Sequence, residues 1–284
     1  MVVSSPSLEK LNRRCVVVSV GLYPGNAEIA LMSVGFHDGD VVILVNSEPR
    51  SVPESVIRGR RRQPTEAMEE LRRFISEFIS KAFKGLNIEV RDVWLNPKLG
   101  LMANVAMLRS IIESYAPCDV IIAMAGGLRW LSSALMFLAI ALNTVGRFIS
   151  VRVDKVFTML EEESPSIRAL FKGVERFIEW PFIPAMAELT REEYSVLKLV
   201  GEGVEKAKYI HKEYNSRFCK SRYKECISMP TVERILVKLR RKNLVKFEAS
   251  GKAYRYYLTP VSVMLVGKPM EQPQNSKNNL DLSG

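Results

Sequence analysis

Three short apolar runs constrain the fold of this chain most strongly. The runs CVVVSV (15–20), VVILV (41–45) and DVIIAM (119–124) are almost continuously apolar, as strands are when helices cover both faces of their sheet. Two further β-prone runs fall at 88–95 and 147–153, and helical patterns lie between the runs, at 26–39, 64–83, 99–115 and 127–142. This alternation predicts an α/β Rossmann-like parallel sheet over residues 15–155.

The bulk composition fits a protein with one or two packed domains. The chain has 284 residues, of which 47% are hydrophobic. Residues 1–14 lack the basic-then-apolar order of a signal peptide, so we expect an N-terminal extension. By inspection every apolar stretch is too interrupted to span a membrane, and we expect a soluble, cytoplasmic protein without a membrane partner.

Positive charge is concentrated in one segment. The net charge is +10, yet residues 1–187 carry 22 Lys and Arg against 20 Asp and Glu. Residues 188–260 carry 17 against 9. A basic segment attached to a nearly neutral one is typical of a nucleic-acid-binding module joined to a module of another kind, although a solvated basic surface is the alternative.

Glycines follow the first and fourth predicted strands. In a doubly wound sheet, ligands bind beyond the carboxyl ends of the strands, where glycine admits close approach and helix N-termini offer free N–H groups to an anion. Arg129 can add a bidentate phosphate contact. The alternative is that these glycines serve turn geometry alone; the GxGxxG and P-loop fingerprints are absent from the sequence. The candidate ligand-binding residues are Gly21, Leu22, Tyr23, Gly25, Asn26, Gly126, Gly127, Leu128 and Arg129.

A basic loop follows the second predicted strand. Four arginines lie within five residues: Arg58, Arg60, Arg61 and Arg62. Because the loop leaves the ligand side of the sheet, it can act as a phosphate-gripping lid, or it can be an ordinary solvated loop.

The basic segment predicts three helices and a hairpin. A capping box, Thr190 with Glu193, opens the first helix within 188–203, and a second helix follows at 204–215. The third lies within 227–245, where Ser228 can cap it and Pro230 fits its first turn. Two β-prone runs at 244–260 flank ASGKA, which predicts a hairpin.

The third helix has an apolar stripe and a basic, hydrogen-bonding face, which suits the major groove of double-stranded DNA. Three helices followed by a basic hairpin describe a winged helix-turn-helix domain at 188–260; a protein-contact module of the same topology is the alternative. The candidate DNA-binding residues are Ser228, Thr231, Arg234, Lys238, Arg241, Lys252, Tyr254 and Arg255.

The remaining segments are predicted as connections. A linker helix is expected within 156–187, and residues 261–284 are expected to be a disordered tail. Cys15 and Cys118 fall at strand starts and are expected in the core. Cys219 and Cys226 lie in an insert at 216–226 that either is stapled by a disulfide or contacts the DNA backbone. The sequence has no CxxC pair, so no metal site is expected.

The sequence AMAGGLRWLSSA after the fourth strand, together with the basic C-terminal module, resembles archaeal CRISPR-associated transcriptional regulators. These proteins fuse a CARF domain, a CRISPR-associated Rossmann fold, to a winged helix-turn-helix. The resemblance covers about residues 15–260. It implies a homodimer whose CARF domains bind a cyclic oligoadenylate, usually cyclic tetra-adenylate, and which controls CRISPR genes in antiviral defence. Ala125 stands where the family commonly has threonine.

The resemblance leaves three functions to compare. The first is a transcription regulator that responds to an allosteric ligand and has no catalytic residues and no resident cofactor. The second is a ring nuclease that cleaves cyclic oligoadenylate, since positioning a ribose hydroxyl needs no triad or metal. The third is a DNA-binding structural dimer without a ligand. Incubating the protein with ligand and looking for a linear product separates the first two.

Overall fold

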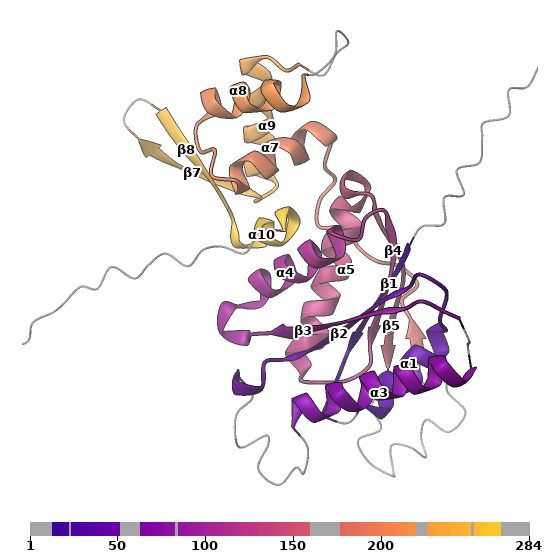
Figure 1. The fold of residues 1–284 in the computed structure, drawn as a ribbon. Coiled ribbons are helices and arrows are strands. Elements are labelled where there is room, and N and C mark those ends of the chain that lie inside the picture. The colour runs from indigo at the N-terminus through magenta and orange to yellow at the C-terminus, as the bar shows by residue number, and fades with distance from the viewer. Residues whose placement is uncertain are drawn as a thin grey trace, which may run out of the picture.

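The computed structural model describes residues 13–22, 24–51, 63–82, 85–159, 177–219, 226–250 and 253–267. The chain forms a sheet with helices on both faces (Figure 1). A smaller group of helices with a hairpin, from the C-terminal part of the chain, lies beside the helices of one face. The basic loop at 58–62, the insert residues 220–225 and the polar tail after Gly267 lie outside the described residues.

The sheet has six strands in the order β3-β2-β1-β4-β5-β6. The first five are parallel and β6 pairs antiparallel with β5. This order confirms the predicted α/β, Rossmann-like sheet, with an antiparallel edge strand that the sequence did not predict. The strands are β1 Arg13–Ser19, β2 Val41–Ser47, β3 Glu89–Leu95, β4 Cys118–Met124, β5 Val151–Met159 and β6 Phe177–Glu179.

Two pairs of helices cover the two faces of the sheet. Helices α1 (Gly25–Val34) and α3 (Pro64–Ala82) pack on the face that carries Val16 and Val18. Helices α4 (Leu101–Glu113) and α5 (Arg129–Ile149) pack on the face that carries Val17. Both faces are therefore apolar, which explains the continuous apolar runs in the sequence. Single 3₁₀ turns, η1 Pro49–Ser51 and η2 Pro97–Leu99, follow β2 and β3.

Helix α5 is longer than its sequence pattern predicts. It has 21 residues and absorbs 147–149, which the pattern had given to the fifth strand. By length and composition α5 could cross a membrane, so the expectation that no stretch passes this test was wrong. Its apolar residues nevertheless face the sheet and α4, and Leu131, Leu135 and Leu138 are fully buried. In this fold α5 is a core helix.

The described residues of the C-terminal part form four helices and a hairpin. Asn215 at the end of α8 holds Ile227 by two hydrogen bonds, from Ile227 N to Oδ1 and from Nδ2 to Ile227 O, both 3.0 Å long, and so fixes where α9 begins. Cys219 and Cys226 form a disulfide, with their Cα atoms 4.9 Å apart. The elements are α7 Arg191–Gly201, α8 Ala207–Phe218, α9 Met229–Arg241, β7 Val245–Ser250, β8 Ala253–Leu258 and α10 Pro260–Val266.

Two connections differ from the sequence expectation. The described part of the expected linker helix at 156–187 is extended: β5 runs on to Met159, and Phe177–Glu179 pairs with it as β6. The expected tail starts with α10, whose residues Val263, Met264 and Leu265 are buried. Each segment gains its structure by packing on a distant partner, which local patterns do not show.

The sheet and the C-terminal part share a packed interface. Figure 1 shows α10 lying between the hairpin and α4. The guanidinium of Arg109 in α4 is fully buried and donates to the Tyr194 hydroxyl at 2.8 Å and to the Glu113 carboxylate at 3.0 Å. The Tyr194 ring stacks on Phe148 of α5, with ring centroids 5.0 Å apart. The hydrogen bond between Arg109 and Tyr194 therefore ties α7 to α4, and the stacking of Tyr194 on Phe148 ties α7 to α5.

Candidate functional site

The order of the strands places one switch point in the sheet. The chain leaves β1 toward β2 through α1 on one face, and it leaves β4 toward β5 through α5 on the other face. Because β1 and β4 are neighbours, the starts of α1 and α5 diverge from adjacent strand ends. This is the place where ligands bind in doubly wound sheets.

The loops after β1 and β4 touch through their backbones. A Cβ atom added to Gly21 would lie 2.9 Å from the Gly127 nitrogen, and one added to Gly126 would lie 3.4 Å from the Gly21 nitrogen. Gly127 also has φ +103°, a conformation that side chains strongly disfavour. The glycines are therefore required for the close packing of the two loops, whether or not a ligand lies above them.

Ser19 connects the same two loops. Its buried hydroxyl oxygen accepts hydrogen bonds from the backbone N–H groups of Ala125 (3.0 Å) and Gly126 (3.2 Å). Ser19 is not among the residues predicted for the site from the sequence. Its place as the one polar residue within the apolar run CVVVSV could have indicated it. Ala125, which replaces the threonine common in the resembling family, is itself buried.

The helix N-termini at the switch point have no side-chain cap from the residue that precedes them. Pro24 precedes α1 and Leu128 precedes α5, and neither residue caps its helix with a side-chain hydrogen bond. The first N–H groups of an uncapped helix lack intrahelical acceptors and carry a partial positive charge. Arg129 is the first residue of α5 and is exposed. This edge therefore combines two helix N-termini and a guanidinium with one carboxylate, that of Glu28 in the first turn of α1.

The structure brings most of the predicted ligand residues to this edge. Gly21 contacts Gly126 and Gly127 directly. Leu128 and Arg129 begin α5, while Gly25 and Asn26 begin α1. Tyr23 lies outside the described residues.

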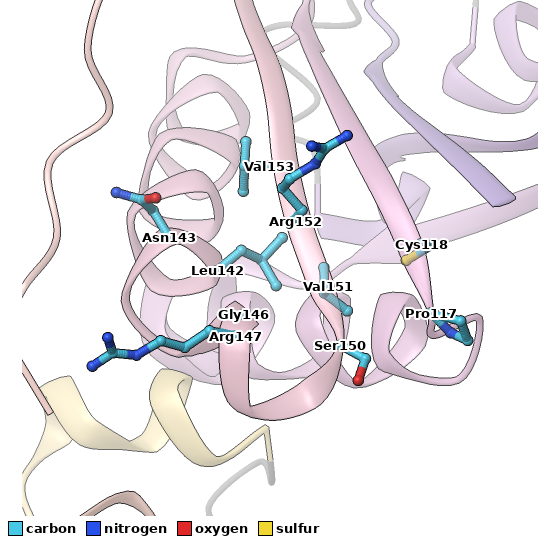
Figure 2. A pocket seen from close by; sticks show the side chains of 10 residues that line it. All are labelled: Pro117, Cys118, Leu142, Asn143, Gly146, Arg147, Ser150, Val151, Arg152 and Val153. Carbon is cyan, nitrogen blue, oxygen red and sulfur yellow. The ribbon is translucent and has the colours of Figure 1, made fainter. Parts of the chain in front are cut away.

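A separate pocket of about 450 Å³ lies at the opposite edge of the sheet. Figure 2 shows Pro117, Ser150 and Val151 around the turn between α5 and β5. Asp40 lies on the same side of the sheet, just before β2, where burial raises the pKa of its carboxyl to about 6 despite the nearby Arg14 guanidinium. No candidate ligand residue lines this pocket, so it does not belong to the predicted site.

The C-terminal part presents an exposed basic face on α9. Its buried residues Val232, Ile235, Leu236 and Leu239 point into the core, and Arg234, Lys238 and Arg241 are exposed on the other side. Thr231 accepts a hydrogen bond from Arg234 Nη2 at 3.3 Å. Ser228 occupies the N-cap position, but its hydroxyl pairs with the Thr231 hydroxyl at 2.9 Å instead of capping the helix.

The basic face of α9 continues toward the sheet domain. Lys238, Arg241 and Lys242 line a groove of about 980 Å³ together with Arg147 of α5. Lys242 Nζ bonds the Glu193 carboxylate at 2.7 Å. Burial raises the pKa of the Glu193 carboxyl, but the Lys242 ammonium and the Thr190 N–H outweigh burial and hold that pKa below its ordinary value.

The same contacts complete the predicted capping box of α7. Glu193 N donates to Thr190 Oγ1 at 3.2 Å, and Thr190 N donates to Glu193 Oε2 at 3.0 Å. Lys242 therefore ties the end of α9 to the start of α7.

The hairpin presents its two described candidates on opposite faces. Tyr254 packs edge-on against Phe247, with centroids 4.9 Å apart, and Arg240 of α9 lies 5.1 Å from the centroid of Phe247. Arg255 points to the other face, where it pairs with Glu205 at 3.8 Å. Only Tyr254 therefore shares a face with α9, and Lys252 lies outside the described residues.

Helix α5 links the switch point to the C-terminal part. Arg129 opens the helix at the ligand edge. Near its other end, Thr144 Oγ1 accepts from Met186 N at 2.9 Å and Asn143 donates to Ile183 O at 2.7 Å. Arg147 donates to Leu189 O, directly before α7.

Comparisons with known proteins give structural likenesses of low TM-score. No protein-family model and no curated protein matches the chain. Among solved structures, the complex structure of hsRosR-S4 is 21% identical and covers 28% of this chain and 67% of its own, with a TM-score of 0.26. Pantoate-beta-alanine ligase from Francisella tularensis, complexed with beta-gamma ATP and beta-alanine, is 11% identical and covers 89% and 88%, with a TM-score of 0.31. The Aeropyrum pernix ORC2 protein is 14% identical and covers 91% and 78%, with a TM-score of 0.23.

Proposed function

We propose that this protein is a DNA-binding transcriptional regulator whose affinity for DNA is set by a small anionic ligand. The sheet is the sensor, of the CARF type, and residues 188–260 are the winged helix-turn-helix. The ligand is a cyclic oligoadenylate, and the protein acts on CRISPR genes as a homodimer. The observation that carries the proposal is that a single helix, α5, begins at the switch point and ends against the first helix of the basic part.

The ligand side of the proposal rests on the donors at the switch point. Two uncapped helix N-termini and the Arg129 guanidinium favour phosphate groups. The glycine contact leaves the turn of Gly126 and Gly127 without side chains. A flat, phosphate-rich ring is a ligand that such an edge can bind through its backbone.

The DNA side rests on the exposed face of α9. Lysine and arginine attract the phosphate backbone, and a helix with exposed arginines can read base edges in the major groove. Arg234 lies near the start of α9, where base contacts are made in helix-turn-helix proteins. We assign a base contact to Arg234 and a phosphate contact to Lys238.

Helix α5 is the proposed route between the two functions. It is a rigid element of about 30 Å, at 1.5 Å per residue. A ligand that shifts its first turn moves Arg147 and Phe148, which hold the start of α7. The coupling is reciprocal, so DNA must change ligand affinity by the same factor as ligand changes DNA affinity.

The test is a pair of titrations. Double-stranded DNA selected by the protein from a random pool is titrated with and without cyclic tetra-adenylate, and cyclic tetra-adenylate is titrated with and without that DNA. Cyclic hexa-adenylate is the control ring. We expect the protein to bind both the DNA and cyclic tetra-adenylate. We expect each of these to change the affinity for the other by the same factor. Binding of neither ring contradicts the sensor assignment, and DNA binding that does not respond to salt contradicts the winged-helix assignment.

Two variants refine the test. We expect Arg129→Ala to weaken ring binding about 10-fold or more while basal DNA affinity stays unchanged, since a charged hydrogen bond contributes about 1.5–3 kcal/mol. Arg73→Ala, which removes an exposed arginine of α3, is the matched control. Equal ring affinity in Arg129→Ala and the parent protein contradicts the role of Arg129. Analysis of the same mixtures for linear product detects ring cleavage.

A further inference from the structure

Strand β2 ends in two polar residues that are as buried as its apolar ones. Asn46 is 4% exposed and Ser47 is 1% exposed. Asn46 Oδ1 accepts a hydrogen bond from Ser47 N at 2.7 Å, which fixes the orientation of the amide. Among the described residues, Asn46 Nδ2 and Ser47 Oγ have no hydrogen-bond partner. A buried donor without a partner costs about 1–3 kcal/mol, so these groups need an explanation.

The strand register places Asn46 next to the switch point, on the β2 side of β1. Val45 pairs with Ser19, and Val20 N donates to Val45 O at 2.8 Å, so Val20 is the neighbour of Asn46 on the β1 side. On the β3 side its neighbour is Trp94. Asn46 therefore lies beside the strand end that leads into the Gly21 loop.

The alternation of side chains along β2 shows to which face of the sheet Asn46 points. Val42 and Leu44 point to the face covered by α1, and Asn46, two residues further, points to the same face. Helix α1 crosses this face from the end of β1 to the start of β2, so its N-terminus lies above the carboxyl ends of these strands. Ser47 points to the opposite face.

The amide of Asn46 and the uncapped start of α1 form a set of donors. Oδ1 is already used by Ser47 N, so only the two N–H bonds of Nδ2 remain. Pro24, the residue before α1, makes no side-chain cap to the first N–H groups of that helix. A partner for this set must bring acceptor oxygens. In dinucleotide-binding Rossmann folds the helix N-terminus takes a phosphate, and an acidic residue about 20 positions on bonds a ribose hydroxyl. Asn46 stands at a comparable position with a neutral amide in place of the carboxylate.

Resting on the proposed function, we propose that Asn46 Nδ2 donates a hydrogen bond to the 2′-hydroxyl oxygen of a ribose whose phosphate lies at the start of α1. The sensor then distinguishes ribonucleotides from deoxyribonucleotides through a neutral amide at the end of β2. The unused donor of the Asn46 amide becomes satisfied only when the ligand is bound.

The test compares two rings on one variant. Cyclic tetra-adenylate and its all-2′-deoxy counterpart are titrated calorimetrically into the parent protein and into Asn46→Ala. We expect the parent to bind the ribose ring about 10-fold more tightly than the deoxy ring, which corresponds to one hydrogen bond. We expect Asn46→Ala to bind both rings equally, at the affinity of the parent for the deoxy ring. Asn87→Ala, an exposed asparagine at the opposite edge, is the control.

A second variant covers a folding defect in the first. Asn46→Asp keeps the oxygen that accepts from Ser47 N and can itself accept from a ribose hydroxyl, so it should retain a preference for the ribose ring. If Asn46→Asp instead weakens both rings strongly and by the same factor, the partner of Asn46 is a phosphate, which a carboxylate repels, and this would overturn the proposal.

The remaining outcomes are also decisive. If Asn46→Ala weakens both rings equally and lowers the melting temperature, Asn46 has a structural role and the proposal fails. If the parent binds both rings equally, there is no ribose contact to explain. If the parent binds neither ring, both the proposed function and this inference are wrong.

Discussion

At the scale of single residues, the contact between Gly21 and Gly127 determines whether the switch point can form. The Cβ of any other residue at 21 would press on a backbone nitrogen, which cannot move as a flexible side chain can. At 127 a Cβ would lie 2.6 Å from Leu131 Cδ1, in a backbone conformation with φ +103°. The two loops therefore depend on two missing side chains.

We expect Gly21→Ala and Gly127→Ala each to destabilise the fold by about 1–3 kcal/mol, because each introduces a backbone clash or a strained φ angle. Chemical denaturation monitored by circular dichroism measures the loss. Gly25→Ala is the matched control, since a Cβ at 25 meets nothing within 4 Å and lies at the start of a helix. It should leave stability unchanged or raise it slightly. Equal effects at all three positions would contradict the packing argument.

At the residue scale the sequence predicted the glycine turn of this site but not the polar residues beside it. Paired glycines and an arginine after an apolar run indicated the turn, and a general rule about parallel sheets gave its place. The sequence alone did not single out Ser19 or Asn46. Ser19 is one polar residue within an apolar run, and Asn46 is the first of two polar residues that end another, so only the structure shows which partners each has and which it lacks.

At the scale of elements, α9 carries most of the predicted DNA surface. Its exposed side faces away from Val232 and Leu236, and the clamp of Asn215 on Ile227 sets its first turn. The periodicity of the sequence predicted this helix and its two faces. It did not predict the clamp, because Asn215 and Ile227 belong to different elements.

We expect two different effects on DNA binding from neighbouring positions of α9. Lys238→Ala should weaken all sequences alike and reduce the slope of log affinity against log salt by about 1. Arg234→Ala should lower the preference for the selected sequence by about 1–3 kcal/mol. Fluorescence anisotropy at several salt concentrations measures both.

The control for α9 is Lys81→Ala, an exposed lysine of α3 whose Nζ lies 3.5 Å from Glu77. It should leave affinity and slope unchanged. The assignment of Arg234 to a base fails if its removal leaves the sequence preference of the protein unaltered.

Boundaries of elements were the least predictable feature at this scale. The apolar run at 147–153 contains both the end of α5 and the start of β5, separated at Ser150, whose positive φ ends the helix. Strand β6 exists only by pairing with β5 and had no local signal that distinguished it from a linker helix. Helix α10 had one that the expectation of a tail overlooked, since Thr259 and Pro260 precede an apolar run and Gly267 follows it.

At the scale of the whole molecule, the sheet and the C-terminal part are joined by buried groups. Arg109 is fully buried, and two of its guanidinium nitrogens, Nε and Nη1, have no hydrogen-bond partner among the described residues. Its bond to the Tyr194 hydroxyl partly offsets that cost. Burial raises the pKa of Tyr194, which keeps its hydroxyl neutral. Stacking on Phe148 adds an apolar contact to the same junction.

We expect the parent protein to unfold in one calorimetric transition and Tyr194→Ala to unfold in two. Arg109 keeps its ion pair with Glu113, but removing the buried ring leaves a cavity beside Phe148 and one hydrogen bond of the guanidinium unmade; truncating a large buried aromatic side chain typically costs about 3–5 kcal/mol. Tyr209→Ala, at a tyrosine of α8 that is 55% exposed, should behave like the parent. A single transition in Tyr194→Ala, at the temperature of the parent, would show that this junction does not couple the two parts.

The position of α10 has a consequence for how such proteins can be divided and recombined. The helix follows the hairpin in sequence and is anchored there by the bond from Ser262 Oγ to Leu244 O at 2.5 Å. Its apolar residues, however, lie against α4 of the sheet domain. A fragment that ends before α10 exposes α4, and a fragment that begins at α7 carries α10 without its cover. The sheet and the C-terminal part are therefore not independent units: joining either one to a foreign partner requires redesigning the surface that packs against α10.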